Sequence, residues 1–383
     1  MNLELSEEQE AVRELADDFV AREITPHVVA WDRAESVDKS IVKKLGALGF
    51  LGLTIPEEYG GSGGDHLAYC LVTEELGRGD SSVRGIVSVS LGLVAKTIAS
   101  WGDEEQKRRW LPRLTAGEAV GCFALTEPGT GSDAGNLTTR AVRDGDDYVI
   151  NGSKMFITNG TWADVVLLFA RTGDVPGHRG VSAFLVPADT PGLTRRTVHG
   201  KLGLRGQATA ELVLEDVRVP AATLLGPEGK GFSLAMSALA KGRMSVAAGC
   251  VGIAQAALDA AVRYAGEREQ FGQPIAGYQL VQELISDISV DVDAARMLTW
   301  RVADLVDRGQ DFATAASTAK LFASEAAVRA ANNALQVFGG YGYIDEYPVG
   351  KLVRDARVMT LYEGTSQIQK LIIGRALTGV SAF

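Results

Sequence analysis

The chain has 383 residues, more than one hydrophobic core normally supports, so we expect two or three domains. Hydrophobic residues make up 46% of the sequence and charged residues 22%, the range of ordinary globular proteins. The net charge of -10 argues against nucleic acid as a partner and against charge-driven attachment to anionic membranes.

The cysteines, the histidines and the apolar runs argue against disulfide-rich, metal-binding, secreted and membrane-spanning proteins. Cys70, Cys122 and Cys250 are too few and too far apart for a disulfide framework. The four histidines are scattered, so no metal-binding spacing is present. The N-terminal residues MNLELSEEQEAV do not have the pattern of a signal peptide, and no uninterrupted apolar run approaches the ~20 residues of a membrane span. We therefore expect a cytoplasmic protein with no metal site and no membrane span.

Residues 1–120 are expected to form an N-terminal helical domain. Ser6 and Gln9 have the spacing of a capping box, and apolar residues recur at helical spacing after them. The segment 45–65 begins apolar and ends in glycines, which predicts a helix followed by an ordered loop. A longer apolar helix over 83–99 is expected to begin after Asp80.

Residues 121–228 are expected to form a separate β domain. Asn151-Gly152 predicts a hairpin turn within it, because this pair favours the backbone of tight two-residue loops. Runs rich in β-branched and aromatic residues predict strands at 148–158, 164–170, 181–187 and 211–220.

Residues 229–383 are expected to form a C-terminal helical bundle domain, because long helical patterns resume there. One apolar stripe runs from Leu280 to Ala295, and the segment 312–338 is rich in alanine. Ser366 and Gln369 are expected to cap the last helix. The order helices, sheet, helices predicts a mainly α protein with a middle β domain.

Three segments carry residues suited to binding a ligand. The glycines and hydroxyls of LTEPGTGSDAG (125–135) can bring backbone N–H groups close to a ligand, although the spacing is not a GxGxxG fingerprint. MFITNG (155–160) is the second segment. The third, EREQFGQPIAGYQL (267–280), places Arg268 and Gln279 around a tight loop, and arginine is the preferred partner of pyrophosphate. A structural loop, a hairpin edge and an ordinary helix–loop–helix are the respective alternatives.

The fourth segment surrounds Glu363, which follows the apolar run Val358, Met359, Leu361, Tyr362 and precedes Gly364. Such neighbours desolvate a carboxylate and raise its pKa toward neutrality, where it acts as a base. The alternative is a solvated glutamate at the N-terminus of a helix, which the helix dipole also favours.

The order and spacing of these four segments resemble the acyl-CoA dehydrogenase family. The resemblance extends from SEEQEAVRELADDF through GFLGLTIPEEYGG to YEGTSQIQ. It implies an FAD-binding homotetramer with an N-terminal helical domain, a β-barrel-like middle domain and a C-terminal four-helix bundle. It also implies that Glu363, in Tyr-Glu-Gly-Thr, removes the α-proton of an acyl thioester while the β-hydride passes to flavin N5. A backbone N–H at the base and a flavin hydroxyl would stabilise the enolate.

The resemblance further implies individual cofactor and substrate contacts. Positions that match the family's FAD contacts are Thr126, Gly131, Ser132, Phe156, Thr158, Arg268, Phe271, Gln279, Gln336, Gly340, Thr365 and Gln367. Of these, Arg268, Phe271 and Gln279 match residues that reach the FAD of a neighbouring subunit. Ser132 and Arg243 match residues beside the substrate.

Two positions on the segment before Arg243 depart from many relatives. Some members place the base where this chain has Gly242, so Glu363 stands alone as the base. Many relatives have an aspartate that contacts the pantetheine arm where this chain has Ala240. That change suggests an acyl-carrier-protein thioester as an alternative substrate.

Arg84 and Ser88 suggest a second alternative. They fall on the arginine and serine with which glutaryl-CoA dehydrogenases hold the distal carboxylate of the substrate, although a nearby glutamate of that subgroup is Gly77 here. The competing interpretation is that Arg84 pairs with an acidic side chain of its own chain or extends to solvent.

The predicted function is therefore FAD-dependent dehydrogenation of a short-chain acyl-CoA, with an electron-transfer flavoprotein as the acceptor. An acyl-ACP dehydrogenase, a glutaryl-CoA-type dehydrogenase and an enoyl-thioester reductase are alternatives on the same fold. A flavin-free binding protein is an alternative of a different class.

Overall fold

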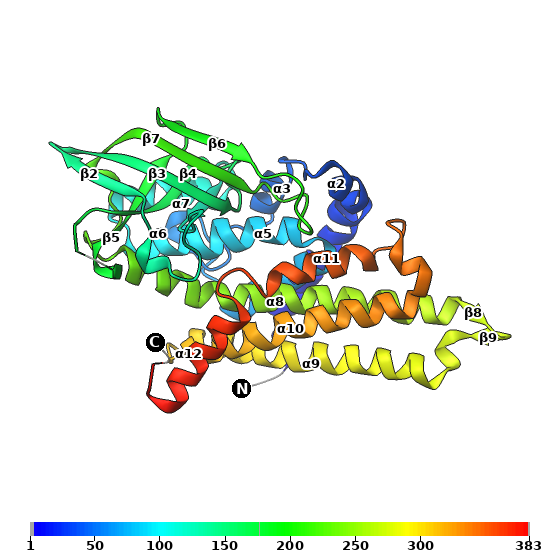
Figure 1. The fold of residues 1–383 in the computed structure, drawn as a ribbon. Coiled ribbons are helices and arrows are strands. Elements are labelled where there is room, and N and C mark those ends of the chain that lie inside the picture. The colour runs from blue at the N-terminus through cyan, green and yellow to red at the C-terminus, as the bar shows by residue number, and fades with distance from the viewer. Residues whose placement is uncertain (1–3, 176, 382–383) are drawn as a thin grey trace.

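The computed structural model describes residues 4–175 and 177–381 of the chain. Figure 1 shows helices first, then a sheet, then long helices, with the sheet stacked over the helical layer. The predicted fold class, mainly helical with a β domain in the middle, is confirmed.

The N-terminal helices begin where the sequence predicts. The Ser6 side chain accepts a hydrogen bond from Gln9 N, and the Gln9 side chain accepts one from Ser6 N, so the capping box is present. The Asp80 side chain likewise accepts from Ser82 N at 2.6 Å. The helices are α1 (Glu7–Phe19), η1 (Val20–Ile24), α2 (Val28–Ala34), α3 (Ile41–Ala47), α4 (His66–Gly79), α5 (Ser81–Val89), η4 (Ser90–Ala95), α6 (Lys96–Trp101) and α7 (Glu104–Thr115).

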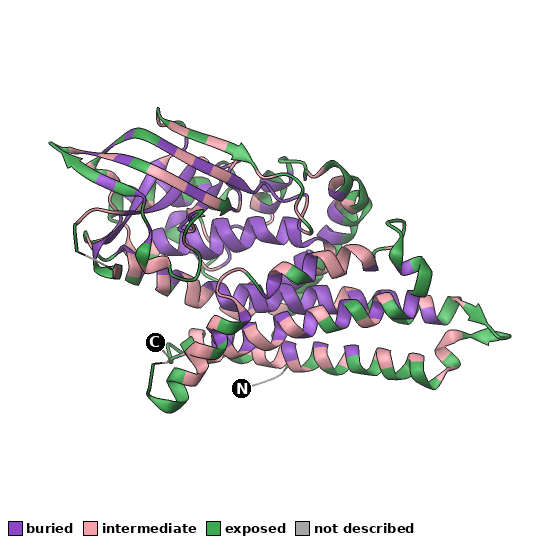
Figure 2. Ribbon diagram, viewed as in Figure 1, coloured by how far each residue is buried: buried purple, intermediate pink, exposed green. Residues whose placement is uncertain are grey.

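One continuous helix, made of α5, η4 and α6, lies inside the molecule (Figure 2). By length and hydropathy alone, this helix and α8 (Gly231–Glu267) both reach the threshold of a membrane span, although charged residues interrupt both. Most of each apolar window, 94% and 72% respectively, is buried inside the protein. Packing in the core therefore accounts for their apolar composition.

The middle domain is a seven-stranded sheet in the order β1-β4-β2-β3-β7-β6, with β5 paired to β4. The odd-numbered residues of β4 from Val165 to Phe169 belong to the core shared with the helices. Its even-numbered residues from Val166 to Ala170 belong to a second core inside the domain. The strands are β1 (Gly121–Ala124), β2 (Arg140–Asp144), β3 (Asp147–Ile157), β4 (Val165–Arg171), β5 (Val181–Pro187), β6 (Leu193–Thr197) and β7 (Ala210–Pro220).

The hairpin turn predicted at Asn151-Gly152 is wrong. Strand β3 passes through both residues, and its pairing with β7 shifts register between Ile150 and Gly152. The Asn151 side chain donates to Asp216 Oδ1 at 3.0 Å and accepts from Asp216 N at 2.8 Å. This pair of residues therefore forms a β-bulge held from the neighbouring strand. The tight turn that joins β2 to β3 lies at Gly145 instead, which has φ 64°.

The C-terminal part packs α10 (Ala313–Phe338) against α8, α9 (Gln279–Asp307), α11 (Val349–Met359) and α12 (Ser366–Thr378). A short hairpin of β8 (Glu269–Gln270) and β9 (Gln273–Pro274) joins α8 to α9. The predicted cap of α12 is one residue too late. Thr365 is the N-cap, since its Oγ1 accepts from Ile368 N at 3.2 Å, whereas the Ser366 hydroxyl donates to Glu325 Oε1 on α10.

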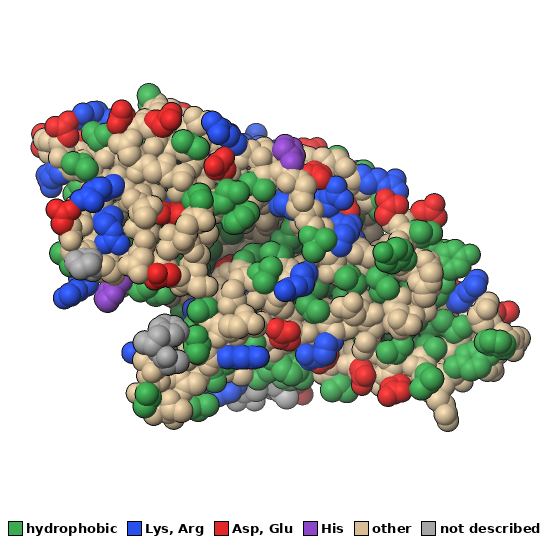
Figure 3. Space-filling view, in the orientation of Figure 1, with side chains coloured by type: hydrophobic (Ala, Val, Ile, Leu, Met, Phe, Trp, Pro, Cys, Tyr) green, Lys and Arg blue, Asp and Glu red, His purple; other side chains and the backbone are tan. Residues whose placement is uncertain are grey.

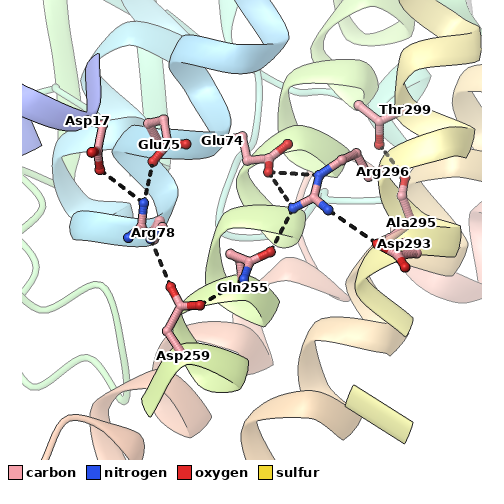
Figure 4. Close-up of polar contacts among 10 residues, drawn as sticks. All are labelled: Asp17, Glu74, Glu75, Arg78, Gln255, Asp259, Asp293, Ala295, Arg296 and Thr299. Atoms are coloured by element: carbon pink, nitrogen blue, oxygen red, sulfur yellow. Dashed lines mark hydrogen bonds and ion pairs between the residues drawn. The ribbon is translucent and has the colours of Figure 1, made fainter. Parts of the chain in front are cut away.

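Two arginines join the N-terminal helices to the bundle (Figure 4). Arg78 of α4 contacts Asp17 of α1 and Asp259 of α8, each at 3.0 Å. Arg296 of α9 contacts Glu74 of α4 at 2.8 Å. These pairs join four helices, so they constrain how the helices are oriented relative to one another.

Candidate active site

Glu363 lies in the turn between α11 and α12, with a left-handed backbone (φ 51°). A residue with a Cβ rarely adopts this conformation, and where it does the surrounding structure holds it. The Gln369 amide of α12 supports the turn, since its Nε2 donates to the carbonyls of Glu363 at 3.2 Å and Gly364 at 3.0 Å. Lys320 Nζ of α10 donates to the same Gly364 carbonyl at 2.8 Å.

The Glu363 carboxylate faces α8 at Gly242. Its Oε2 atom is buried and has no hydrogen-bond partner among the described residues. A methyl group at Gly242 would overlap Oε2, and it would also lie 2.9 Å from Leu93 Cδ2. The glycine therefore makes the space that the carboxylate occupies, and a second carboxylate does not fit there.

Burial raises the pKa of the Glu363 carboxyl. The positive charges of Arg84, Lys320 and Arg243 oppose that rise. A desolvated, unpartnered carboxylate surrounded by cations is available to take a proton, because no hydrogen bond has to break first. These features favour the general-base interpretation over the solvated glutamate.

Arg243 lies one residue beyond Gly242 and is buried. Among the described residues it forms one hydrogen bond, a long one of 3.4 Å from Nη1 to Ser317 Oγ. Its Nε has no partner among the described residues. Burial lowers the pKa of Arg243, and the charge of Glu363 raises it. Donors left free beside Glu363 are suited to a polar group of a substrate.

Arg84 is 1% exposed, so it does not extend to solvent. Its Nη1 donates to Ser88 Oγ at 3.0 Å, its Nη2 donates to the Tyr362 hydroxyl, and within residues 4–175 and 177–381 it forms no ion pair. Both parts of the competing interpretation are therefore wrong. Gly77 has no room for the glutamate of the glutaryl subgroup, since a Cβ there would lie 2.8 Å from Gly249 O.

The candidate residues of the β domain lie on two adjoining segments. Met155 N donates to Thr126 O at 2.9 Å, which brings 125–135 and 155–160 together. Gly131 and Ser132 are exposed at the tip of the first segment. Phe156 is 62% exposed and left-handed (φ 60°), and Thr158 Oγ1 donates to Gln207 Oε1 at 3.3 Å. Figure 3 shows one face of the molecule, which is hollowed between the β domain and the helical bundle.

A third group of candidate residues lies at the opposite end of the bundle from α12 (Figure 1). Arg268 and Gly340 line one cavity of about 460 Å³ together with Phe338. Phe271, at the tip of the β8–β9 hairpin, is 96% exposed. Gln279 begins α9, whose 29 residues extend about 43 Å. Gln336 is exposed beside this cavity, whereas Thr365 and Gln367 lie on the α12 side with Glu363.

Sequence reasoning missed Lys320, Glu127 and the role of Gln369. Lys320 is a single cation on the buried alanine face of α10. A lone charged residue in an alanine-rich stretch was the feature of the sequence that could have identified it. Glu127 lies inside the first glycine-rich segment. Its carboxylate accepts from Lys154 Nζ at 2.8 Å, from Thr138 N and Oγ1, and from Thr139 N.

The fold places one sheet between two helical parts of the chain and brings the Glu363 carboxylate against α8. Three family models match the chain: acyl-CoA dehydrogenase N-terminal domain over residues 6–118, middle domain over 122–217 and C-terminal domain over 229–378. The chain belongs to the acyl-CoA dehydrogenase family, and it is an oxidoreductase that acts on CH–CH bonds.

Relatives match over nearly their whole length. The probable acyl-CoA dehydrogenase YngJ of Bacillus subtilis is 49% identical over 98% of this chain and 100% of the relative. The mitochondrial short-chain specific acyl-CoA dehydrogenase of Homo sapiens is 44% identical over 97% of this chain and 90% of the relative.

Solved structures agree with this assignment. Butyryl-CoA dehydrogenase from Megasphaera elsdenii is 41% identical with a TM-score of 0.96, over 98% of this chain and 100% of that one. Glutaryl-CoA dehydrogenase from Mycobacterium smegmatis in complex with FADH2 is 37% identical with a TM-score of 0.95, over 99% and 96%. A chain from work on the electron transferring flavoprotein of Acidaminococcus fermentans is 42% identical with a TM-score of 0.97, over 99% and 100%.

Proposed function

We propose that this chain is an FAD-dependent dehydrogenase of short-chain acyl-CoA thioesters, with Glu363 as the catalytic base. The observation that carries the proposal is the unpartnered Glu363 carboxylate, held in a left-handed turn and desolvated against Gly242. Similarity to butyryl-CoA dehydrogenase and to short-chain specific enzymes supports a short acyl chain.

The α-hydrogen of a thioester is weakly acidic, so its removal needs a positioned base in a dry site. The raised pKa of Glu363 makes the carboxylate a stronger base than a solvated one. Gly242 and Leu93 exclude water from one side of the carboxylate. The unpartnered Arg243 Nε can orient a polar group of the substrate beside it.

The chain's own residues fit an isoalloxazine ring and a pyrophosphate. Gly131 has no atoms within 4 Å of its Cβ direction, so its backbone is open to a ligand, and the exposed Phe156 offers an aromatic face. Arg268 lines the open cavity at the far end of the bundle, where it can pair with phosphate oxygens. When bound, FAD would supply the acceptor for the β-hydride.

The separation of these groups supports a cofactor site completed by a neighbouring subunit. Arg268, Phe271 and Gln279 lie at the end of the bundle away from Glu363, so one chain does not bring both groups to one flavin. Leu280 is 75% exposed and Val290 68% exposed on the outer face of α9, where a second subunit would cover them. We therefore propose a homotetramer, and a fully active, FAD-loaded monomer by light scattering would contradict it.

An electron-transfer flavoprotein is proposed as the electron acceptor. The support is the similarity to the chain from work on the electron transferring flavoprotein of Acidaminococcus fermentans. A cytoplasmic location stays a prediction from the sequence.

The test is Glu363→Gln, assayed with a panel of acyl-CoA and acyl-ACP thioesters and an artificial electron acceptor. The variant should keep its yellow flavin spectrum and its melting transition but lose at least ~10³-fold in turnover, since no second carboxylate fits at Gly242. Turnover within tenfold of the wild type would exclude Glu363 as the base. An enoyl-thioester reductase would instead give little acceptor reduction in this assay and would need an enoyl thioester and an electron donor to turn over.

A carboxylated acyl chain is a second candidate substrate, favoured by Arg84. Among the described residues this buried guanidinium has hydroxyl partners but no carboxylate partner, and its Nε has no hydrogen bond. In Arg84→Gln, kcat/KM for a glutaryl thioester should fall by the equivalent of ~2–4 kcal/mol in transition-state stabilisation. The kcat/KM for a butyryl thioester should not change. Equal losses on both substrates would leave Arg84 with a structural role only.

A further inference from the structure

Lys320 is a buried cation on a helix face made of alanines. It is fully buried on α10, between the buried Ala316 and Ala323. Its Nζ donates to the carbonyl of Gly364 at 2.8 Å. Burying an ammonium group costs free energy unless its charge is paired and hydrogen-bonded. The position of Lys320 directly behind the Glu363 turn therefore suggests a role in that turn.

The turn that carries Glu363 depends on hydrogen bonds from two helices. Glu363 has φ 51°, and Gly364 has φ 92°. A Cβ at Gly364 would lie 2.5 Å from Gln369 Nε2, so the backbone and the amide are in close contact. Lys320 from α10 and Gln369 from α12 both donate to the Gly364 carbonyl. These two side chains hold the turn in a conformation that a glutamate would otherwise rarely adopt.

Lys320 also contributes charge to the site. Glu363 and Arg243 face it, together with Cys250 of α8 and Glu325 of its own helix. Around Glu363 itself lie Lys320, Arg84 of α5 and Arg243, and the hydroxyls of Tyr69 on α4 and of Tyr362 are close enough to feel its charge. Burial lowers the pKa of Lys320 to about 8, so the ammonium is the main form at neutral pH.

We propose that Lys320 is a positioning residue for the base: its hydrogen bond to the Gly364 carbonyl aims the Glu363 carboxylate, and its charge keeps that carboxylate ionised in a desolvated site. The inference rests on the proposed function of Glu363. Gln369 shares the hydrogen-bonding role but carries no charge, so the two contributions are separable.

Three variants separate the contribution of the hydrogen bond from that of the charge. Lys320→Met removes the donor and the charge, Lys320→Gln removes the charge but keeps a donor, and Gln369→Leu removes the other donor at constant charge. Each is loaded with FAD, and kcat and kcat/KM for butyryl-CoA are measured from acidic to alkaline pH.

In both Lys320 variants, the acidic limb of the kcat/KM profile should shift to higher pH by about one unit, because a cation that stabilises the ionised form of Glu363 is lost. On the plateau, Lys320→Met should lower kcat at least ~10-fold and change KM by less than about threefold, since the base is misplaced and the substrate contacts remain. Gln369→Leu should lower kcat without moving the limb. Lys320→Gln keeps the test decisive if the Met variant does not fold.

An acidic limb at the wild-type position in both Lys320 variants would overturn the proposal, as would an equal shift in Gln369→Leu. Failure of the base assignment looks different, because Glu363→Gln would then stay active whatever the Lys320 variants do.

Discussion

Glu127 on the β domain and Glu363 on the helical bundle are both carboxylates withdrawn from solvent in motif segments: Glu127 is buried, and Glu363 is half-buried with its Oε2 atom buried. Glu127 is 4% exposed, and its oxygens accept from Lys154, Thr138 and Thr139. Burial alone would raise the pKa of Glu127, but Lys154 and the hydrogen bonds lower it to about 2. In the part of the chain that the structure describes, no such donor reaches Glu363 Oε2, so the effect of burial prevails and the pKa of Glu363 is raised.

The difference shows that hydrogen-bond satisfaction, rather than burial, separates a structural carboxylate from a reactive one. Glu127 anchors the segment that carries Gly131 and Ser132, because every strong acceptor direction is occupied by its own chain. Glu363 keeps an oxygen free in a strained turn that its neighbours hold in place.

Among changes that leave both carboxylates in place, the largest expected effect follows from filling the space that keeps Glu363 free. In Gly242→Ala the new methyl group overlaps Oε2, so the carboxylate must move. We expect kcat for butyryl-CoA to fall by about 10²-fold, the scale of a misplacement of about 1 Å. Gly266→Ala on the same helix is the matched control, since a methyl group there meets no atom within 4 Å. Equal activity of the two variants would mean that Gly242 does not shape the site.

A smaller effect, on stability, is expected at the other carboxylate. Glu127→Gln breaks the buried pair with Lys154 and should lower the free energy of unfolding by about 2 kcal/mol in urea titration. The variant should also bind FAD less tightly, because the anchored segment loosens. A turnover loss in the FAD-loaded variant as large as that of Glu363→Gln would break the distinction between the two carboxylates.

The two carboxylates should affect the pH dependence of stability with opposite signs. The pKa of Glu127 is lowered, so its stabilisation is present above the unfolded value of about 4.3 and is lost as the pH falls toward about 2. The pKa of Glu363 is raised, so stability is lost as the pH rises past that unfolded value. At pH 7, Glu363→Gln should therefore be more stable than the wild type in thermal unfolding. A less stable variant would indicate that the Glu363 carboxylate is satisfied.

Local patterns predicted much of the fold, and their failures have physical causes. Strands β4 and β5 are buried on both faces, so their apolar runs were visible, whereas β2 and β6 are mostly exposed and were missed. Asn151-Gly152 favours a turn in isolation, but Asp216 on the adjacent strand holds it as a bulge. The start of α12 was misplaced because Thr365 and Ser366 are both good caps.

The sequence predicted the part of the site that depends on residues close together in the chain. The neighbours of Glu363 in sequence indicated desolvation, and the resemblance to a family supplied the cofactor residues. Lys320 and Gly242 come from helices far away in the sequence, and nothing in the sequence places a lysine 44 positions earlier behind the Gly364 carbonyl. Long-range contacts of this kind depend on how the helices pack.

The most direct test is an infrared titration of the two carboxylates in the FAD-loaded wild type, assigned by difference against Glu363→Gln and Glu127→Gln. The Glu363 band should titrate above the ordinary glutamate pKa of about 4.3, while the Glu127 band should stay ionised to well below it. A Glu363 carboxylate that titrates at or below the ordinary value would contradict the account that a free, desolvated carboxylate is the base.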